Sequence, residues 1–374
     1  MRSATKYLVF VFVLFLFEWG FALEPELVLE MPVEGRIIGG DILDGKVVSS
    51  SREKLWVSTP EGKRSFQMSL KPNQGVVASN DGGFFGITTY SKDVPVGFLG
   101  AERFELHSAD GEKLWEIEDP EVSEFYVSNG AKLTVGISAN GESPESHLAF
   151  YNQAGELIFG TKVGFLQGVS FSENCRCFFA SSAKDGLVSF DASEHPEDNF
   201  GTCDKFAVSP DGDYVATVLD GDLKFFHQGK PIGDPREIDP LVIAMSFSPE
   251  NEYLAVVDKK NLYLFEVAAG RLLWKYTLDQ TELSFISVDV SPGAERIIAG
   301  IDFDKGREAQ REDRHTKGFA YTFDKDGRIT WQREFSYQLW SALFPQVQFS
   351  SDGTRFSVVT REKVYVFATS QPEE

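Results

Sequence analysis

The sequence predicts an all-β chain that folds as one β-propeller of eight four-stranded blades. Three observations predict this fold. A turn that begins with serine recurs at intervals of 37 to 59 residues, and a glycine followed four residues later by an aromatic recurs within the same units. The segments between these landmarks alternate apolar and polar residues with a period of two, which is typical of strands rather than helices. Four short strands in a repeat of about 40 to 45 residues indicate a propeller blade.

The composition is that of a globular, strongly acidic chain. Its 374 residues carry a formal net charge of −21, with 42% hydrophobic residues. This apolar content is enough to build a core, so the bulk of the chain is not disordered. A surface this acidic repels phosphate, so we exclude nucleic acid as a partner.

The first 22 residues are expected to lie outside the fold. Arg2 and Lys6 precede an apolar run over 7–17, and small residues precede a cleavage point after Ala22. Eleven apolar residues at about 1.5 Å each span only half of a ~30 Å hydrocarbon core. We therefore expect a cleaved secretory signal and a propeller over 23–374, exported to the periplasm or the extracellular space. An uncleaved membrane anchor is the alternative, and no later stretch is long and apolar enough to span a membrane.

The serine turns mark the first hairpin of each unit. They begin at Ser79, Ser128, Ser172, Ser209, Ser248, Ser291 and Ser350. A weaker copy lies upstream, where Leu43-Asp44-Gly45 separates two strand-like runs. The glycine and aromatic landmarks follow in most units, as Gly62/Phe66, Gly111/Trp115, Gly155/Phe159, Gly270/Trp274 and Gly327/Trp331. Each unit then contains two hairpins, and hence four strands.

The two ends of the chain predict how the ring closes. The last unit, 346–369, supplies only three strands, whereas 26–32 is a lone strand-like segment before the first complete unit. We expect segment 26–32 to complete the last blade. This arrangement gives eight blades from the 352 residues after the cut, or about 44 each. Seven blades is the alternative if 36–70 is not a full blade.

The segments His107–Trp115 and Thr322–Trp331, each with a glycine before the tryptophan, resemble the tryptophan-docking repeats of quinoprotein-type (PQQ-like) propellers. The Ser-Pro-Asp-Gly turn at Ser209 looks equally like that of WD40-type repeats. The resemblance implies a fold and not an activity. It also implies that each aromatic packs between neighbouring blades, with its indole N–H bonded to a backbone carbonyl.

The sequence lacks the residues that the resemblance to quinoprotein dehydrogenases would require for catalysis, as far as these residues are compared. Their adjacent cysteine pair is absent, since Cys175 and Cys177 are two apart on one expected strand and Cys203 belongs to the next unit. We expect all three to be small buried residues, with one disulfide involving Cys203 as the alternative. No cofactor is predicted.

Other signals of chemistry are weak. The five histidines are scattered without a metal or nucleophile motif. Asp324, Asp326 and Gly327 resemble half of a calcium loop, but we interpret them as a turn because the distal bidentate glutamate is missing. Asp302 and Asp304, at the start of a long insertion, are a slightly better calcium candidate and still a weak one.

The insertions favour one face of the ring as a binding surface. They are expected at 91–101, 139–146, 301–318 and 337–345, which are all second-to-third or fourth-to-first connections of blades 2, 3, 7 and 8. Long loops on a rigid scaffold commonly carry recognition. The predicted binding residues share aromatic or charged character; they are Tyr337, Trp340, Phe344, Asp302, Asp304, Arg311 and His315.

Two functions remain open from the sequence. The favoured hypothesis is a secreted, non-enzymatic propeller that binds a protein, peptide or glycan through this face, similar in outline to the propeller lipoprotein of the outer-membrane assembly machinery but without its lipid-anchor cysteine. The alternative is a propeller enzyme, either a degenerate quinone-dependent dehydrogenase or a glycan-cleaving enzyme with carboxylates around the central channel.

Overall fold

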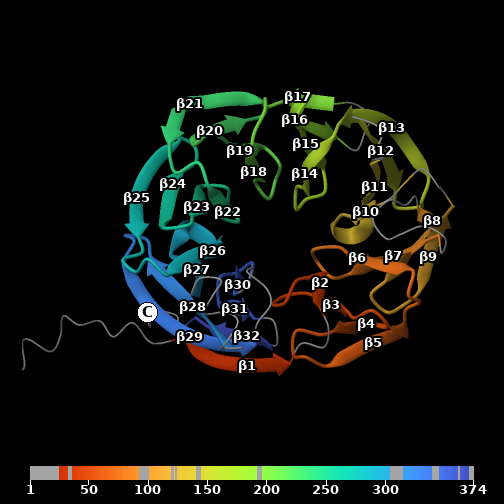
Figure 1. Ribbon diagram of the computed structural model, residues 1–374, viewed down its shortest axis with the longest axis horizontal. Helices are drawn as coiled ribbons and strands as arrows, with labels where there is room; N and C mark the ends of the chain where they lie inside the picture. Colours follow the sequence, from red (N-terminus) through yellow and green to blue (C-terminus); the bar gives the residue numbers. More distant parts are fainter. Residues whose placement is uncertain are drawn as a thin grey trace, which may run out of the picture.

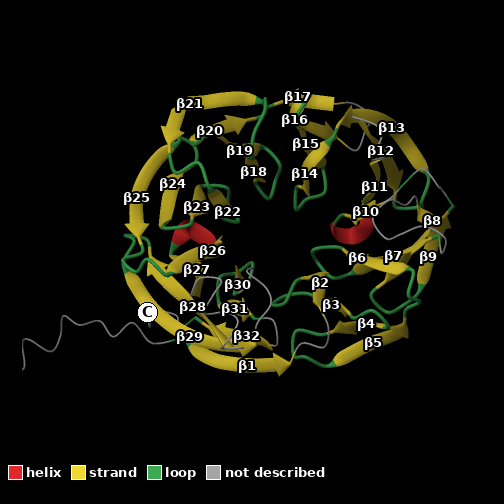
Figure 2. Cartoon of the chain, in the orientation of Figure 1, coloured by secondary structure: helices red, strands yellow, loops and turns green. Residues whose placement is uncertain are grey.

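The computed structural model describes residues 25–32, 36–91, 101–118, 122, 124–139, 145–191, 196–303, 315–338, 345–360 and 363–369. Within them the chain forms eight four-stranded antiparallel sheets around a ring (Figure 1). The helices in this part of the chain are two three-residue 3₁₀ turns, η1 (Asn129–Ala131) and η2 (Pro292–Ala294) (Figure 2). The predicted eight-bladed propeller is confirmed, and the seven-bladed alternative is wrong.

In each blade the strands follow one another as a meander from the ring axis to the rim. Blade 1 contains β2 (Arg36–Gly40), β3 (Val47–Ser50), β4 (Lys54–Ser58) and β5 (Arg64–Ser69). Blade 2 contains β6 (Gln74–Ala78), β7 (Phe84–Tyr90), β8 (Ala101–Ser108) and β9 (Lys113–Ile117). Blade 3 contains β10 (Glu124–Val127), β11 (Leu133–Ala139), β12 (Glu145–Asn152) and β13 (Leu157–Gly164). Blade 4 contains β14 (Leu166–Phe171), β15 (Cys177–Ser182), β16 (Gly186–Asp191) and β17 (Pro196–Asn199).

The second half of the ring repeats this plan. Blade 5 contains β18 (Lys205–Val208), β19 (Tyr214–Leu219), β20 (Asp222–His227) and β21 (Lys230–Glu237). Blade 6 contains β22 (Val242–Phe247), β23 (Tyr253–Asp258), β24 (Asn261–Glu266) and β25 (Arg271–Thr277). Blade 7 contains β26 (Leu283–Val290), β27 (Arg296–Phe303), β28 (His315–Asp324) and β29 (Ile329–Gln338). Blade 8 contains β30 (Gln346–Phe349), β31 (Arg355–Val359), β32 (Lys363–Ala368) and, from the other end of the chain, β1 (Glu26–Pro32).

Blade 8 closes the ring as predicted. Strand β1 pairs antiparallel with β32, from Glu26 opposite Ala368 to Pro32 opposite Lys363. Figure 1 shows β1 at the rim, outside β32. This pairing covers the edge that β32 would otherwise expose, and it joins the two ends of the described chain.

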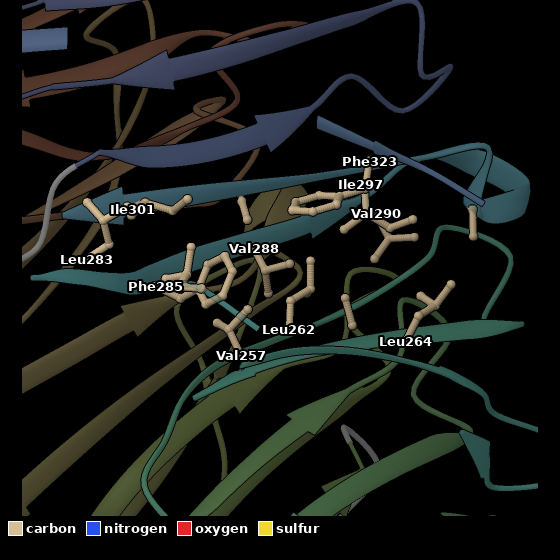
Figure 3. Packing of buried hydrophobic residues seen from close by; sticks show 14 residues of the cluster. Val257, Leu262, Leu264, Leu283, Phe285, Val288, Val290, Ile297, Ile301 and Phe323 are labelled. Atoms are coloured by element: carbon tan, nitrogen blue, oxygen red, sulfur yellow. The ribbon is translucent and has the colours of Figure 1, made fainter. Parts of the chain in front are cut away.

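The core of the described chain is divided among the junctions between blades. Its buried apolar side chains form eight clusters, one between each pair of neighbouring blades. In the cluster between blades 6 and 7, Val257, Leu262 and Leu264 face Phe285, Val288 and Ile297 (Figure 3). Successive residues of a strand therefore point into the two different clusters on either side of the blade, because each blade packs against a neighbouring blade with both of its faces.

The recurring serines close the first hairpin of seven blades. In each case the buried serine Oγ accepts the backbone N–H of the residue five positions later, where the second strand begins. Ser248, for example, is fully buried, and its Oγ lies 3.1 Å from Tyr253 N. A serine is required there because the short hydroxyl side chain satisfies a backbone donor that water does not reach.

The ring has two different faces. The turn face carries the first-to-second and third-to-fourth turns, and the connection face carries the second-to-third and fourth-to-first connections. On the turn face, polar groups of one serine turn bond to the next turn along the ring. Asp81 Oδ2 accepts the Gly130 N–H at 2.8 Å, and Asn251 Nδ2 donates to Asp211 Oδ2 at 2.6 Å. Much of the polar capacity of this face is therefore used between blades.

The docking of aromatics between blades is also confirmed. Trp115 Nε1 donates to Gln153 O at 3.1 Å, and Trp274 Nε1 donates to Lys325 O at 2.8 Å, in each case in the next blade. The ring lies on the glycine of that blade's turn. A Cβ at Gly155 would lie 2.7 Å from Trp115 Cδ2. The glycine and aromatic landmarks are thus the two halves of one contact, made by successive blades.

Candidate binding face and central channel

Blade 7 extends further than its neighbour on the connection face. The docking contacts align Trp331 of β29 with Trp274 of β25, but β25 ends at Thr277 whereas β29 continues to Gln338. The partner strand β28 begins correspondingly early, with His315 opposite Gln338 and Thr316 opposite Tyr337. The open end of the β28–β29 hairpin consists of His315–Gly318 and Phe335–Gln338 and is named the blade 7 hairpin. It adds four residues to each strand, or about 13 Å. An ion pair of 2.7 Å between Lys317 and Glu334 lies at its base.

Three of the seven predicted binding residues belong to strands of this blade. Tyr337 lies in β29 and His315 in β28, so neither is part of a loop, and Asp302 in β27 lies opposite Gly318. The prediction that Tyr337 lies in an irregular connection is wrong, because the β28–β29 ladder extends through this residue. Asp304, Arg311, Trp340 and Phe344 lie outside the described residues. The grouping of all seven at one binding surface stays a prediction.

The interior of the ring contains a cavity of about 1600 Å³. First strands of blades 1, 2, 6, 7 and 8 line it, together with the first turns of blades 4 and 5. It also reaches between blades 8 and 1, where Ser50, Arg52, Ser357 and Thr360 contribute to its wall. A central channel was expected from the propeller fold, but this lateral extension was not, because the sequence of one strand does not indicate how closely two blades approach each other.

Three carboxylates stand near the turn-face end of this channel. They are Asp41 after β2, Glu173 in the first turn of blade 4 and Asp289 in β26. Partial burial raises the pKa of Glu173, and repulsion from Asp289 and Asp41 adds to the effect. Burial also raises the pKa of Asp289, although Ser246 Oγ and Phe349 N–H donate to its carboxylate at 2.6 and 2.7 Å. Asp289 thereby links the first strands of blades 6, 7 and 8.

The cysteines are buried and form no disulfide. Cys177 and Cys203 lie in the cluster between blades 4 and 5, as expected for small buried residues. Cys175 differs from the prediction, because it lies in the turn before β15, with a φ of 60°, and not on the strand with Cys177. Burial raises the pKa of the Cys175 thiol, which favours its protonated form.

Metal ligation finds no support among the residues that are described. No group of three or more His, Cys, Asp or Glu there is suited to hold an ion. Asp324 Oδ1 accepts the N–H groups of Asp326 and Arg328, so this carboxylate stabilises its own turn. Of the other calcium candidate, Asp302 is on β27 and Asp304 lies outside the described residues.

Comparisons with known proteins show the fold and not the family. No protein-family model matches the chain, and no curated protein matches it. Among solved structures, a variant of KlHsv2 with loop 6CD replaced by a Gly-Ser linker is similar, with a TM-score of 0.53, 14% identity, and coverage of 82% of this chain and 98% of that chain. A eukaryotic initiation factor gives a TM-score of 0.54 at 9% identity, covering 84% of this chain and 91% of the other. Kluyveromyces marxianus Hsv2 gives 0.50 at 12% identity, covering 80% and 99%.

These similarities support a propeller in general. They do not distinguish PQQ-like from WD40-like repeats, so that resemblance stays a prediction. In the part of the chain that the structure describes, there is no helix of the length and hydrophobicity needed to cross a bilayer.

Proposed function

We propose that this protein is an exported, non-enzymatic propeller that binds a partner protein with its connection face, around blades 7, 8, 2 and 3. The observation that carries the proposal is the blade 7 hairpin. Its backbone continues the β28–β29 ladder past the end of the neighbouring blade, and a rigid element of this kind loses little conformational entropy on binding. The proposal of export rests on the leader-like segment 1–22.

A difference between the two faces of the ring also supports the connection face as the binding surface. On the turn face, polar groups such as those of Asp81 and Asn251 bond to neighbouring turns. The connection face carries the connections of variable length in blades 2, 3, 7 and 8. Recognition usually resides in such connections, while the scaffold beneath them stays fixed.

A protein or peptide is favoured over a glycan by the lining of the channel. Sugar rings characteristically stack on exposed aromatic faces, but the aromatic residues in the described lining, Phe247 and Phe349, are both buried. Extended polypeptide instead needs strand edges and hydrogen-bonding side chains. Both are present around the channel.

The test uses two variants of the connection face. One carries Tyr337→Ala with Trp340→Ala, and the other replaces 305–317 by a Gly-Ser turn. Leu272→Ala, an exposed change on the rim of blade 6, is the control. We expect both face variants to fold and to lose capture of a partner from the native exported fraction, while the control retains it. Undiminished capture by both folded variants would rule out this face.

A glycan-cleaving enzyme is the second candidate, because the carboxylates Glu173 and Asp289 both have raised pKa values beside a deep channel. The engagement of Asp289 by Ser246 and Phe349 argues for a structural role instead. Turnover of a polysaccharide panel that Glu173→Gln abolishes would establish the enzyme. Turnover in a dye-linked dehydrogenase assay with added quinone and calcium would establish the other enzymatic alternative.

A further inference from the structure

Two arginines stand at the connection-face end of the channel, and no described residue supplies a counterion to either. Arg36 begins β2, and Arg52 lies in the turn between β3 and β4, next to Ser50, which pairs with Arg36. Both line the cavity, and within the described part of the chain neither guanidinium group has a hydrogen bond or ion pair. In a chain of net charge −21, carboxylates are abundant, so two unpaired guanidinium groups at one cavity mouth are available to an external anion.

The opposite end of the same channel is negative. Asp41 follows β2 and Glu173 faces it from blade 4, and the carboxylates are close enough to repel one another. Arg36 and Asp41 are five positions apart along β2 and the residue after it, which corresponds to about 16 Å along the channel. The channel is therefore positive at the connection face and negative at the turn face. This polarity suits a ligand whose own charges are opposite and similarly spaced.

A third observation concerns the wall between blades 8 and 1. Ser357 of β31 is completely buried and lines the cavity, and no described residue forms a hydrogen bond with its Oγ. A buried hydroxyl without a partner costs free energy unless a polar group reaches it. Because this Oγ has no exposed surface, a polar occupant of the channel reaches it only if the wall between blades 8 and 1 moves.

The shape of the site favours extended polypeptide. The cavity of about 1600 Å³ exceeds the ~300–1,000 Å³ of ordinary small-molecule pockets. Strand β2 is the first strand of its sheet, so among the described strands one edge of it faces the channel without a strand partner. An extended peptide is able to add to such an edge through main-chain hydrogen bonds.

We propose that the channel binds an extended peptide segment of the partner, with a carboxylate at Arg36 and Arg52 and a basic side chain toward Asp41 and Glu173. This inference rests on the proposed function and deepens it, because the arginine mouth opens on the connection face. The carboxylate comes either from the C-terminus of the peptide or from an acidic side chain close to its end. About five residues of extended chain separate the two charges.

The probe is the fluorescein-labelled peptide Gly-Lys-Val-Thr-Val-Thr-Val with a free C-terminus, whose lysine precedes the terminal residue by five positions. A second probe, Gly-Lys-Val-Thr-Val-Thr-Glu amide, carries the carboxylate on a side chain instead. A third probe, Gly-Lys-Val-Thr-Val-Thr-Val amide, carries no carboxylate. Fluorescence anisotropy with the intact protein measures binding at low and physiological ionic strength.

We expect at least one of the two carboxylate-bearing probes to bind at least tenfold more tightly than the third. Arg36→Gln with Arg52→Gln should remove that preference, whereas Arg328→Gln, the same change on an exposed turn at the rim, should alter the affinity by less than twofold. Asp41→Asn with Glu173→Gln should weaken binding of the lysine probes but not of versions with glutamine in place of lysine. Equal binding of all three probes, absence of binding, or no effect of the double arginine variant would each overturn the inference.

Failure of this inference is distinguishable from failure of the proposed function. If the double arginine variant still captures the partner and the blade 7 hairpin variants do not, the connection face is used without the channel, and only the inference is wrong. If the hairpin variants also retain capture, the proposed function is wrong as well.

Discussion

The contact between Trp274 and Gly327 allows the docking of blades to be tested by a double-mutant cycle. Truncating a buried aromatic costs about 3–5 kcal/mol. Trp274 is partly exposed but also donates the 2.8 Å hydrogen bond to Lys325 O, so we expect Trp274→Ala to lower the free energy of unfolding by about 3 kcal/mol. In a chain of this length the entropy of unfolding is about 0.7 kcal/mol per degree, so the melting temperature should fall by about 4 °C.

Gly327→Ala tests the other half of the contact. Gly327 has a φ of 81°, and a Cβ there would lie 2.8 Å from Trp274 Cδ2. In the parent protein the substitution combines the strain of the left-handed backbone, about 1–2 kcal/mol, with a steric overlap. In the Trp274→Ala background only the backbone strain remains, so the double variant should be more stable than the two single effects predict.

The assay is urea unfolding followed by circular dichroism, with Leu272→Ala as the control on the same strand. Leu272 is 44% exposed, and its truncation should change the free energy of unfolding by less than about 1 kcal/mol. Additivity of the Trp274 and Gly327 variants within about 0.5 kcal/mol, or near-parental stability of Trp274→Ala, would refute the docking interpretation.

Three further predictions follow from the fold. Deleting 26–32 removes β1 and exposes the edge of β32, so the variant should aggregate or melt several degrees lower; a melting temperature within about one degree of the parent would contradict ring closure by this strand. Because burial raises the pKa of Asp289, the folded state binds its proton more tightly than the unfolded chain, and the stability that this proton contributes is lost as the pH rises through the folded-state pKa. Asp289→Asn keeps an acceptor without the charge and should therefore gain stability relative to the parent as the pH rises above about 4, the ordinary pKa of an aspartate. Asp289→Ala should instead cost about 1–3 kcal/mol by leaving the Phe349 N–H unpaired, and a pH-independent difference for the asparagine variant would contradict this account. Ser248→Ala should cost about 1–2 kcal/mol in a urea titration, because the Tyr253 N–H loses its buried acceptor, and an unchanged midpoint would show that the serine turns are not held in this way.

The fold was predictable because its signals are local and repeated. Each serine turn closes over five residues, and each landmark glycine lies four residues before an aromatic in the strand that follows it. The completion of blade 8 by 26–32 followed from counting strands at the two ends. Each repeat unit of the sequence folds into one blade, and eight such blades packed side by side form the ring.

The site was less predictable because it depends on contacts between blades. Tyr337 was assigned to a loop because aromatic residues after a strand give no sign of where the ladder ends. Its pairing with Thr316, 21 positions earlier, keeps it in β29. The channel polarity was missed for a similar reason, since Arg36, Arg52 and Glu173 come from three separate segments whose proximity is a property of the closed ring.

The central claim, that a partner protein contacts the connection face, is tested most directly by site-specific photo-crosslinking. A benzoylphenylalanine replaces Lys317 on the blade 7 hairpin in one variant and Glu250 on the turn face of blade 6 in another. Both are irradiated in the native exported fraction, and adducts of the protein are resolved by mass. We predict a discrete adduct from position 317 and none from position 250. An adduct from position 250 alone, or from neither position, would contradict the claim.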